Sequence, residues 1–407
     1  MANPEAAKLI ALLNGIDQFV PGIRDDDVAR VQLRDAAARC LARLQTPYER
    51  AWELASVNPV VFASLQIGMD LGLWQAWHAA GGGDKTLDDI ASMCETSGKG
   101  RVRPDINLLR RLMRLLAMFN VLEEKGVDLY APTPFSLEVG DEAACVAQTL
   151  QCATDHFIRA SHNLPGYMAK ISYREPLDPK TSNYVDAFGL EFFDRVKRDP
   201  RMNKSFADHM AGFTQRKTPW VDFFDTGARL LSGAELADGG SPLCVDVGGG
   251  VMGVDITHLL TKHPDLPAGS LVLQDLPEVV GAANVDGRIK KMAHDLFQPQ
   301  PIKGSRAYFF HAVFHDWPEA EALDFLGHTA AAMRKGYSKL LIYEVMIPAA
   351  GATRWQAIMD VGMMSLLSAH ERTETQWRSL LTKAGFRILN FWPDPKGIET
   401  LIEAELA

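Results

Sequence analysis

A glycine-rich segment beside a single acid is the first feature of the chain that could do chemistry. Residues 243–253 read LCVDVGGGVMG, an apolar run that carries Asp246, breaks into three glycines and leads into a helical pattern. Glycine permits a turn with positive φ and leaves no Cβ, so a ligand can lie against bare backbone. The helix that follows offers free backbone N–H groups at its start. The pattern predicts a nucleotide-like ligand, although such turns also occur in α/β proteins that bind none.

The glycine spacing leaves two kinds of cofactor open, and the acid helps to choose between them. Gly248, Gly250 and Gly253 spell G-x-G-x-x-G, which taken alone suggests NAD(P). Asp275, at the end of the next apolar run, could hold the ribose of NAD or of S-adenosylmethionine. Asp246 lies beside the glycines, where a carboxylate would repel a pyrophosphate and suit a cation or an amino group. The acid therefore favours S-adenosylmethionine.

Two further segments complete the expected cofactor site. Leu276 follows Asp275 directly in LVLQDLP, and Asp295 lies in AHDLF. Asp295 could accept a hydrogen bond from the adenine amino group, with Leu296 and Phe297 flanking the ring. The alternative for Asp295 is a simple turn or capping residue.

The elements that must position these residues alternate between strands and helices from residue 243 onward. This alternation predicts a doubly wound, Rossmann-like α/β domain over residues 236–407. The predicted strands are 243–247, 271–274, 307–310 and 339–343, with a late pair near 386–392 and 398–404. The predicted helices are 254–263, 277–283, 319–334 and 374–384.

The first 235 residues read mostly as helix. Residues 85–139 predict helix, turn, helix and hairpin, a winged-helix arrangement within an N-terminal domain over 1–140. Residues 141–235 read as a helical connector that contributes to the substrate pocket. Arginines on the second winged-helix helix suggest DNA binding, or else the solvated face of an amphipathic helix. The net charge of −9 favours the solvated face, so we expect no nucleic-acid partner.

The segment Pro59–Trp77 is apolar almost all round and is interrupted by Asp70. A helix of this kind is buried, either in a large core or against a second copy of the chain in a homodimer. Five scattered cysteines form no metal-binding spacing, so we expect reduced thiols and no metal. The N-terminal residues lack a basic segment and a long apolar run, which predicts a cytoplasmic protein with no membrane partner.

Six segments in a fixed order carry a more specific resemblance. They are VDVGGG, LVLQDLPEVV, MAHDLFQPQP, HAVFHDWPE, LLIYEVMIP and HERTETQWRSLLTKAGF. Together with the N-terminal pattern, they resemble class I S-adenosylmethionine-dependent O-methyltransferases of the plant caffeic-acid type and their fungal relatives. The resemblance implies a homodimer built by the winged-helix domain. It also implies a small-molecule substrate, a phenolic or enolic, polyketide-type secondary metabolite.

The resemblance also implies roles for individual residues. His315 in HDWP matches the general base, and a histidine can take a phenol proton near neutral pH. Glu344 and Glu371 match two acids that flank and orient this histidine, and taken alone they could equally form surface salt bridges. The residues expected to shape the substrate site are Asp316, Trp317, Asp360, Met363 and Met364, the methionines as adaptable apolar walls.

Two departures from the family pattern keep a second activity open. Val251 and Met252 precede Gly253, where the family usually has glycine two places after the triplet. His311 stands where fungal relatives often have arginine, and we expect it at the substrate site. The fungal group includes pericyclases that hold S-adenosylmethionine as a fixed cation and transfer no methyl group. In such an enzyme His156 and His162 would supply an extra base or acid at the substrate.

Overall fold

In the computed structural model, seven strands lie in the order β10-β11-β8-β7-β4-β5-β6, and a short strand β9 pairs with β8. Strands β4 to β8 are parallel, and β11 and β10 run antiparallel at one edge. The chain order reverses between β4 and β7, which makes the carboxyl ends of these strands the expected ligand site. The bounds are β4 Cys244–Val247, β5 Leu271–Asp275, β6 Ile289–Ala293, β7 Ala307–His311, β8 Lys339–Ile347, β9 Arg372–Thr373, β10 Phe386–Pro393 and β11 Glu399–Leu406.

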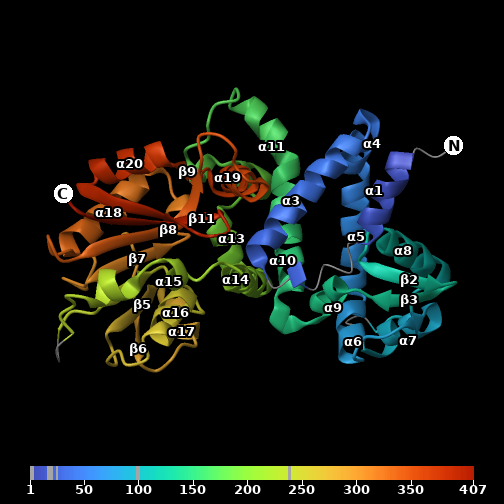
Figure 1. Cartoon of the computed structure of the whole chain (residues 1–407), viewed down its shortest axis with the longest axis horizontal. Coiled ribbons are helices and arrows are strands. Elements are labelled where there is room, and N and C mark those ends of the chain that lie inside the picture. The colour runs from blue at the N-terminus through green and yellow to red at the C-terminus, as the bar shows by residue number, and fades with distance from the viewer. Residues whose placement is uncertain (1–3, 16–21, 24–25, 98–100, 237–239) are drawn as a thin grey trace. The chain divides into compact units, whose positions relative to one another are not determined.

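Helices cover both faces of this sheet (Figure 1). One face packs Val245 and Phe310 against Phe325 and Trp377, and the other packs Phe309 against Trp220. The predicted Rossmann-like fold is therefore confirmed. The covering elements are α15 Trp220–Phe223, η6 Gly227–Leu231, α16 Val254–Lys262, α17 Pro277–Ala282, η7 Phe314–Asp316, α18 Glu319–Ala332, α19 Arg354–Leu367 and α20 Glu374–Lys383.

The structure describes residues 4–15, 22–23, 26–97, 101–236 and 240–407, and these residues form two compact units. The first unit contains the chain up to Leu71 together with Asp84–Ala131. The second unit contains Gly72–Gly83 and Pro132–Ala407, and it includes the whole sheet described above.

The first unit contains the predicted winged-helix arrangement. Strand β1 precedes helices α7 and α8, and the hairpin of β2 and β3 follows them, in a three-stranded sheet of order β1-β3-β2. Arg110 of α8 donates two hydrogen bonds of 2.8 Å to Asp128 in the hairpin, so this arginine joins helix to wing. The elements are α1 Pro4–Asn14, α3 Asp27–Leu44, α4 Pro47–Trp52, η2 Glu53–Val57, α5 Asn58–Asp70, β1 Lys85–Thr86, α7 Leu87–Ser97, α8 Ile106–Met118, β2 Leu122–Gly126 and β3 Leu129–Pro132.

Two local predictions for this part of the chain are wrong. The hairpin ends at Pro132, because Thr133 caps a new helix, α9 Pro134–Gly140, whose first residue is proline. The single apolar helix over Pro59–Trp77 is two helices, α5 and α6 Leu73–Ala79, separated at Gly72 with φ +67°.

No single described helix has the length and apolar character to cross a membrane. The bent pair Pro47–Asp70 and Leu73–Ala79 meets that test when taken together, on length and composition alone.

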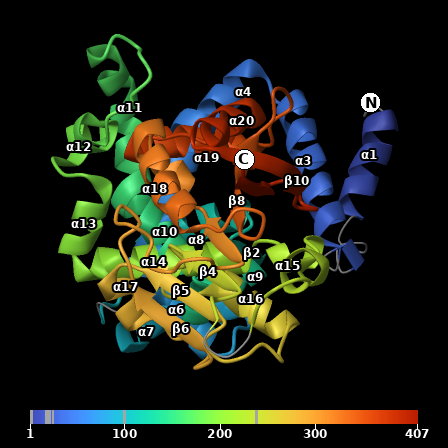
Figure 2. The ribbon, with the colours of Figure 1, turned by 90° about the vertical axis from the view of Figure 1, so that its left-hand side faces the viewer.

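A helical segment of the second unit precedes the sheet. Figure 2 shows α11, α12 and α13 along one side of the ribbon. Tyr184 and Phe192 of this segment pack with Met363 of α19 in one apolar cluster. The elements are η3 Glu142–Ala144, α10 Val146–Cys152, η4 Ala153–Phe157, α11 Ile158–Lys170, η5 Pro179–Thr181, α12 Asn183–Phe188, α13 Phe192–Arg198 and α14 Pro200–Gln215.

Candidate active site

Three elements at the carboxyl edge of the sheet bring His315, Glu344 and Glu371 together. His315 lies in the short helix η7 after β7, Glu344 lies within β8, and Glu371 directly precedes β9. His315 Nδ1 is 2.9 Å from Glu371 Oε1 and 3.9 Å from Glu344 Oε2. All three side chains are buried, so the pairing is not a surface salt bridge. This geometry fixes the imidazole ring and leaves Nε2 directed away from Glu371.

The loop that carries His315 is held by side chains from two neighbouring strands. Glu344 Oε1 accepts hydrogen bonds from the backbone N–H groups of Val313 (2.9 Å) and Phe314 (2.7 Å). Buried Arg372 donates to the carbonyl groups of Phe314 (2.6 Å) and Trp317 (2.8 Å). These bonds lock the loop from both sides. Arg372 was missed in the sequence, although it stands next to Glu371 in HERTE.

Asp316, Trp317 and Asp360 surround the same group. Asp316 Oδ1 is 3.5 Å from His315 Nε2, and Trp317 packs edge-on against Phe297 with ring centroids 4.8 Å apart. Asp360 of α19 accepts the backbone N–H of Glu371 at 3.1 Å. Asp360 thereby supports the residue that orients His315.

Burial and neighbouring charges set the protonation of this group. Burial lowers the pKa of His315, but the carboxylates of Glu371, Glu344 and Asp316 outweigh it and raise this pKa to about 10. Burial raises the pKa of Asp316 to about 7. The site therefore holds a proton on His315 readily, and ionised carboxylates stabilise that charge.

The same three side chains also offer a set of metal ligands. One donor atom each from His315, Glu344 and Glu371 lies within 4.8 Å of the others. Glu344 Oε2 and Glu371 Oε2 are buried without a hydrogen-bond partner among the described residues. His315 and Glu371 of this set also contact each other directly, with Nδ1 and Oε1 2.9 Å apart.

The glycine loop after β4 has the conformation that its sequence predicts. Gly248 and Gly250 have φ +79° and +69°, in the left-handed region that glycine favours. Val251 and Met252 lie in a turn that ends at Gly253, the N-cap of α16. The family pattern has glycine two places after the triplet, so this chain has one more residue before Gly253. The turn accommodates that residue before the helix begins.

Asp275 joins the second strand to this loop. Its Oδ2 accepts the Gly250 N–H at 2.9 Å, and its Oδ1 accepts the N–H of Leu276 at 2.7 Å. Burial raises the pKa of Asp275, while these two N–H groups lower it. The carboxylate is held at the edge of the loop, where it retains lone pairs for a ribose hydroxyl.

Replacing Gly249 by alanine is expected to weaken cofactor binding strongly. A Cβ at this position would meet the Leu273 side chain and lie 2.5 Å from Asp246 Oδ2. The loop must then shift, at a cost of about 1–3 kcal/mol. Calorimetric titration with S-adenosylmethionine should show at least about tenfold weaker binding. Gly281→Ala is the control, because a Cβ there meets nothing within 4 Å, and native affinity in Gly249→Ala would contradict the prediction.

Asp246 and His311 have buried side chains close to the glycine loop and to the start of α16. Asp246 is 1% exposed and its carboxylate lies behind Gly249. His311, the last residue of β7, binds Asp255 in the first turn of α16. The structure therefore places both residues in the layer beneath the loop.

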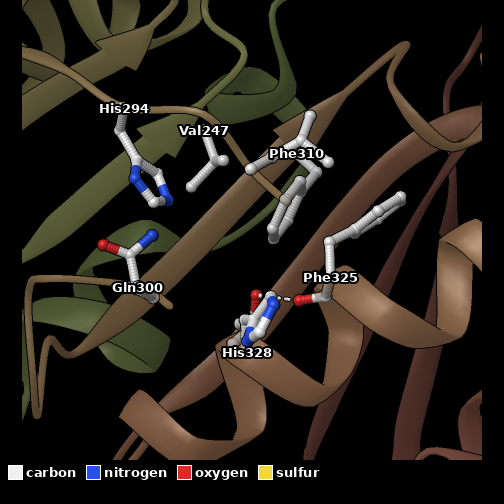
Figure 3. A pocket seen from close by; sticks show the side chains of 8 residues that line it. Val247, His294, Gln300, Phe310, Phe325 and His328 are labelled. Atoms are coloured by element: carbon white, nitrogen blue, oxygen red, sulfur yellow. Dashed lines mark hydrogen bonds between the residues drawn. The ribbon is translucent and has the colours of Figure 1, made fainter. Parts of the chain in front are cut away.

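The expected adenine segment follows β6 directly. Asp295 is exposed and its Oδ1 accepts the N–H of Phe297 at 3.0 Å, the turn contact that was its alternative role. Leu296 lines a small pocket between the sheet and α18, which Figure 3 shows from close by. Its other lining residues are Val247, His294, Gln300, Phe310, Phe325, His328 and Thr329.

His156 and His162 have different surroundings. His156 is fully buried in η4, with Nδ1 2.5 Å from the Tyr184 hydroxyl and 3.1 Å from an Arg195 guanidinium nitrogen. Its Nε2 has no hydrogen-bond partner among the described residues. Burial lowers the pKa of His156 to about 4, so its ring is neutral. His162 is exposed on α11 and bonds the Ile158 carbonyl, so it does not join the His156 group.

Met363 and Met364 lie on α19 as expected. Met363 is buried in the apolar cluster with Tyr184 and Phe192, and Met364 is half-buried. Tyr184 and Arg195 were missed in the sequence, because their contacts with His156 span 28 and 39 residues.

A family model and the matching known proteins indicate the same kind of enzyme. Residues 173–387 match the O-methyltransferase domain family. O-methyltransferase ATR12 of Stachybotrys chlorohalonatus is 44% identical over 98% of this chain and 100% of that protein. Demethylsterigmatocystin 6-O-methyltransferase of Aspergillus parasiticus is 30% identical over 90% of each chain.

Solved structures show the same fold. LepI in complex with S-adenosylmethionine is 25% identical, with a TM-score of 0.86 over 99% of this chain and 100% of that chain. A structure described as a pericyclic reaction enzyme has a TM-score of 0.86 at 24% identity, over 98% of this chain and 100% of that chain. OxaC with sinefungin and meleagrin is 25% identical, with a TM-score of 0.79 over 98% and 99% of the two chains.

Proposed function

Because this chain belongs to the O-methyltransferase family, we propose that it methylates a phenolic or enolic hydroxyl of a polyketide-type secondary metabolite, with His315 as general base. The methyl donor of this S-adenosylmethionine-dependent enzyme is its cofactor. The observation that carries the proposal is the buried pair of His315 Nδ1 and Glu371 Oε1, 2.9 Å apart. Such a pair fixes Nδ1 as a donor and leaves Nε2 for the substrate. Because the pKa of His315 is about 10, the neutral ring that can accept a proton at Nε2 becomes more abundant as the pH rises.

His315 acts on the substrate hydroxyl in this mechanism. Its Nε2 takes the hydroxyl proton as the new oxygen–carbon bond forms. Glu371 stabilises the resulting imidazolium through Nδ1, and Glu344 holds the loop by the N–H groups of Val313 and Phe314. When bound, S-adenosylmethionine supplies an electrophilic methyl group on a sulfonium. Alignment of the two reactants supplies much of the remaining acceleration.

The residues around the glycine loop suit this cofactor. Gly249 has no Cβ, so its backbone packs directly against Leu273 and Asp246, and the buried Asp246 Oδ2 lacks a hydrogen-bond partner among the described residues. Asp275 presents a carboxylate for the ribose, and Asp295 presents one for the adenine amino group. We assign Gly248, Gly250, Leu276, Leu296 and Phe297 to the same site.

We assign the substrate to the space bounded by the HDWP loop and α19. Asp316 and Trp317 lie on that loop, and Asp360 supports Glu371 from α19. Met363 and Met364 would supply an adaptable apolar wall for an aromatic ring.

Incubation with radiolabelled S-adenosylmethionine and a panel of phenolic and enolic polyketides tests the proposal. We expect a labelled methyl ether and one equivalent of S-adenosylhomocysteine per product. If the protein binds the cofactor but forms no S-adenosylhomocysteine with any substrate, the proposal fails.

A pericyclase or dehydratase of a polyketide–pyridone pathway is the second candidate. The observation in its favour is buried His156, whose Nε2–H has no partner among the described residues and could donate a proton while Arg195 donates to Nδ1. This activity requires turnover without loss of the cofactor methyl group. Product formation in step with S-adenosylhomocysteine would exclude it.

We propose a homodimer built through the first unit. Helix α1 has no buried residue along its eleven described positions, and Leu9, Leu12 and Leu13 are 61%, 67% and 53% exposed. Apolar area of this kind typically marks an interface. We also propose three domains, over residues 1–140, 141–235 and 236–407. We propose a cytosolic location for the protein. Light scattering behind gel filtration should give twice the monomer mass, and a monomer at all concentrations would refute the dimer.

A further inference from the structure

Five ionisable side chains form a buried charge cluster beneath the glycine loop, and the catalytic proposal uses none of their mutual contacts. His311 lies at the centre, with Nδ1 2.6 Å from Asp255 Oδ2 and Nε2 2.9 Å from Lys217 Nζ. Lys217 donates to Glu399 at 2.6 Å, and His311 Nε2 is 3.4 Å from the same oxygen. Asp246 is the fifth member, and its pKa is raised by burial and by Asp255 and is lowered by His311. We name these residues the buried charge cluster.

The cluster connects five parts of the second unit. Asp246 belongs to β4, Asp255 to the first turn of α16, and His311 to the end of β7. Glu399 begins β11, and Lys217 lies between α14 and α15. The side chains of His311, Lys217 and Glu399 are 6%, 9% and 2% exposed, so solvent screens their charges weakly. A change in charge on His311 or Asp255 therefore acts on Asp246, whose carboxylate lies next to Gly249 of the loop.

Two of the three acids of the cluster have a basic partner at short distance. Asp255 lies 2.6 Å from His311 and Glu399 lies 2.6 Å from Lys217, whereas Asp246 has no such contact among the described residues. Asp246 Oδ2 is buried and has no hydrogen-bond partner among the described residues. Burial holds the pKa of this carboxyl well above its usual range, which favours the neutral acid.

Four more titratable groups face the cluster: Cys244 on β4, Asp275 on β5, Tyr343 on β8, and buried Asp394, which accepts the Glu399 N–H at 3.1 Å. Burial raises the pKa of the Cys244 thiol well above its usual value and also raises that of the Tyr343 phenol, so both stay neutral near pH 7. Asp275 on β5 adds a further charge that raises the pKa of Asp246. A positive charge on the outer side of the glycine loop would instead lower the pKa of Asp246.

We propose that the buried charge cluster is a proton-linked support for the cofactor loop. In this proposal Asp246 releases its proton to solvent when the positively charged cofactor binds. His311 is a positioning residue: it holds Asp255 at the start of α16 and stabilises the Asp246 anion. No covalent bond forms between Asp246 and the cofactor, and the proton passes to the buffer. The inference rests on the proposed cofactor site, but not on methyl transfer.

Calorimetric titration with S-adenosylmethionine in phosphate and in Tris tests the proposal, because released protons add the ionisation enthalpy of the buffer. At pH 7 we expect the two buffers to give different enthalpies, corresponding to release of up to one proton. Asp246→Asn should abolish the difference. His311→Gln should weaken binding about tenfold and move the release to higher pH. His311→Arg keeps a fixed positive charge and should restore most of the affinity.

The other end of the same helix provides the control. His263 is the C-cap of α16 and contacts the Thr226 hydroxyl at 2.7 Å, so His263→Gln should leave affinity and proton release unchanged. In His311→Gln we expect a higher KM for S-adenosylmethionine with kcat at saturating cofactor within about twofold. Equal enthalpies in both buffers from pH 6 to 9, or native affinity in His311→Gln, would overturn the proposal. If cofactor binding releases a proton but no substrate yields S-adenosylhomocysteine, the result supports the proton-linked cluster and contradicts the proposed methyl transfer.

Discussion

Replacing His315 by glutamine should lower kcat for methyl transfer by about 10²–10⁴-fold, the usual contribution of a positioned general base. Glutamine can still donate to Glu371 Oε1, which His315 Nδ1 now contacts at 2.9 Å. It cannot take a proton from the substrate hydroxyl. The loop should keep its shape, because Glu344 and Arg372 hold it through backbone groups of Val313, Phe314 and Trp317.

Single-turnover formation of S-adenosylhomocysteine measures this effect, and calorimetry should find cofactor affinity within about threefold of native. His370→Gln is the matched control. His370 immediately precedes Glu371, but it is half-buried and lies outside the pair of His315 and Glu371. A loss in His315→Gln of less than about tenfold at saturating substrate would contradict the role of general base.

Local periodicity was sufficient to predict most of the sheet. Strands β4, β5, β7, β8, β10 and β11 lie where their apolar runs indicated. Strand β6, IKKMA, was missed because it is an edge strand whose lysines are exposed and whose apolar pattern is correspondingly weak. Helix α9 was assigned to a hairpin because PFSLEV alternates like a strand, whereas the Thr133 cap and Pro134 start a helix.

Contacts between distant residues limited what could be predicted of the site. The motif around His315 indicated its partner Glu371, 56 residues away, through the family resemblance alone. Lys217 and Glu399 are 182 residues apart, and neither lies in a recognisable motif. Their pairing follows from the path of the chain from α14 to β11, which local sequence does not specify. A buried polar cluster of this kind can be identified only from the three-dimensional positions of the strands and of the segments between them.

The two glutamates of the active site have separable functions. Both were expected to orient His315, but Glu344 Oε1 is engaged by two backbone N–H groups, and its other oxygen lies 3.9 Å from the ring. Glu371 makes the direct contact. Glu344 therefore shapes the loop and adds negative charge, whereas Glu371 sets both the orientation and the proton affinity of the ring.

Replacing Glu371 by glutamine should move the pH dependence of catalysis downward. Of the groups that raise the pKa of His315 to about 10, Glu371 contributes most, while burial opposes it. Without that carboxylate the pKa falls, so the ring loses its proton at lower pH. The inflection of log kcat/KM, which reports the free enzyme, should shift down by at least about one unit. The maximal rate should also fall, because the amide cannot stabilise the imidazolium that forms.

The two effects of Glu371→Gln combine into a deficit that depends on pH. Near pH 7 the variant has more unprotonated base than the native enzyme, which partly offsets its lower rate. In alkaline buffer both rings are unprotonated and the full deficit appears. The substrate hydroxyl titrates identically in both proteins, so the difference between the profiles reports His315. Glu374→Gln is the control, because Glu374 lies in the same segment, is exposed and pairs with Arg378. An inflection that stays in place in Glu371→Gln would show that Glu371 does not set the proton affinity of His315.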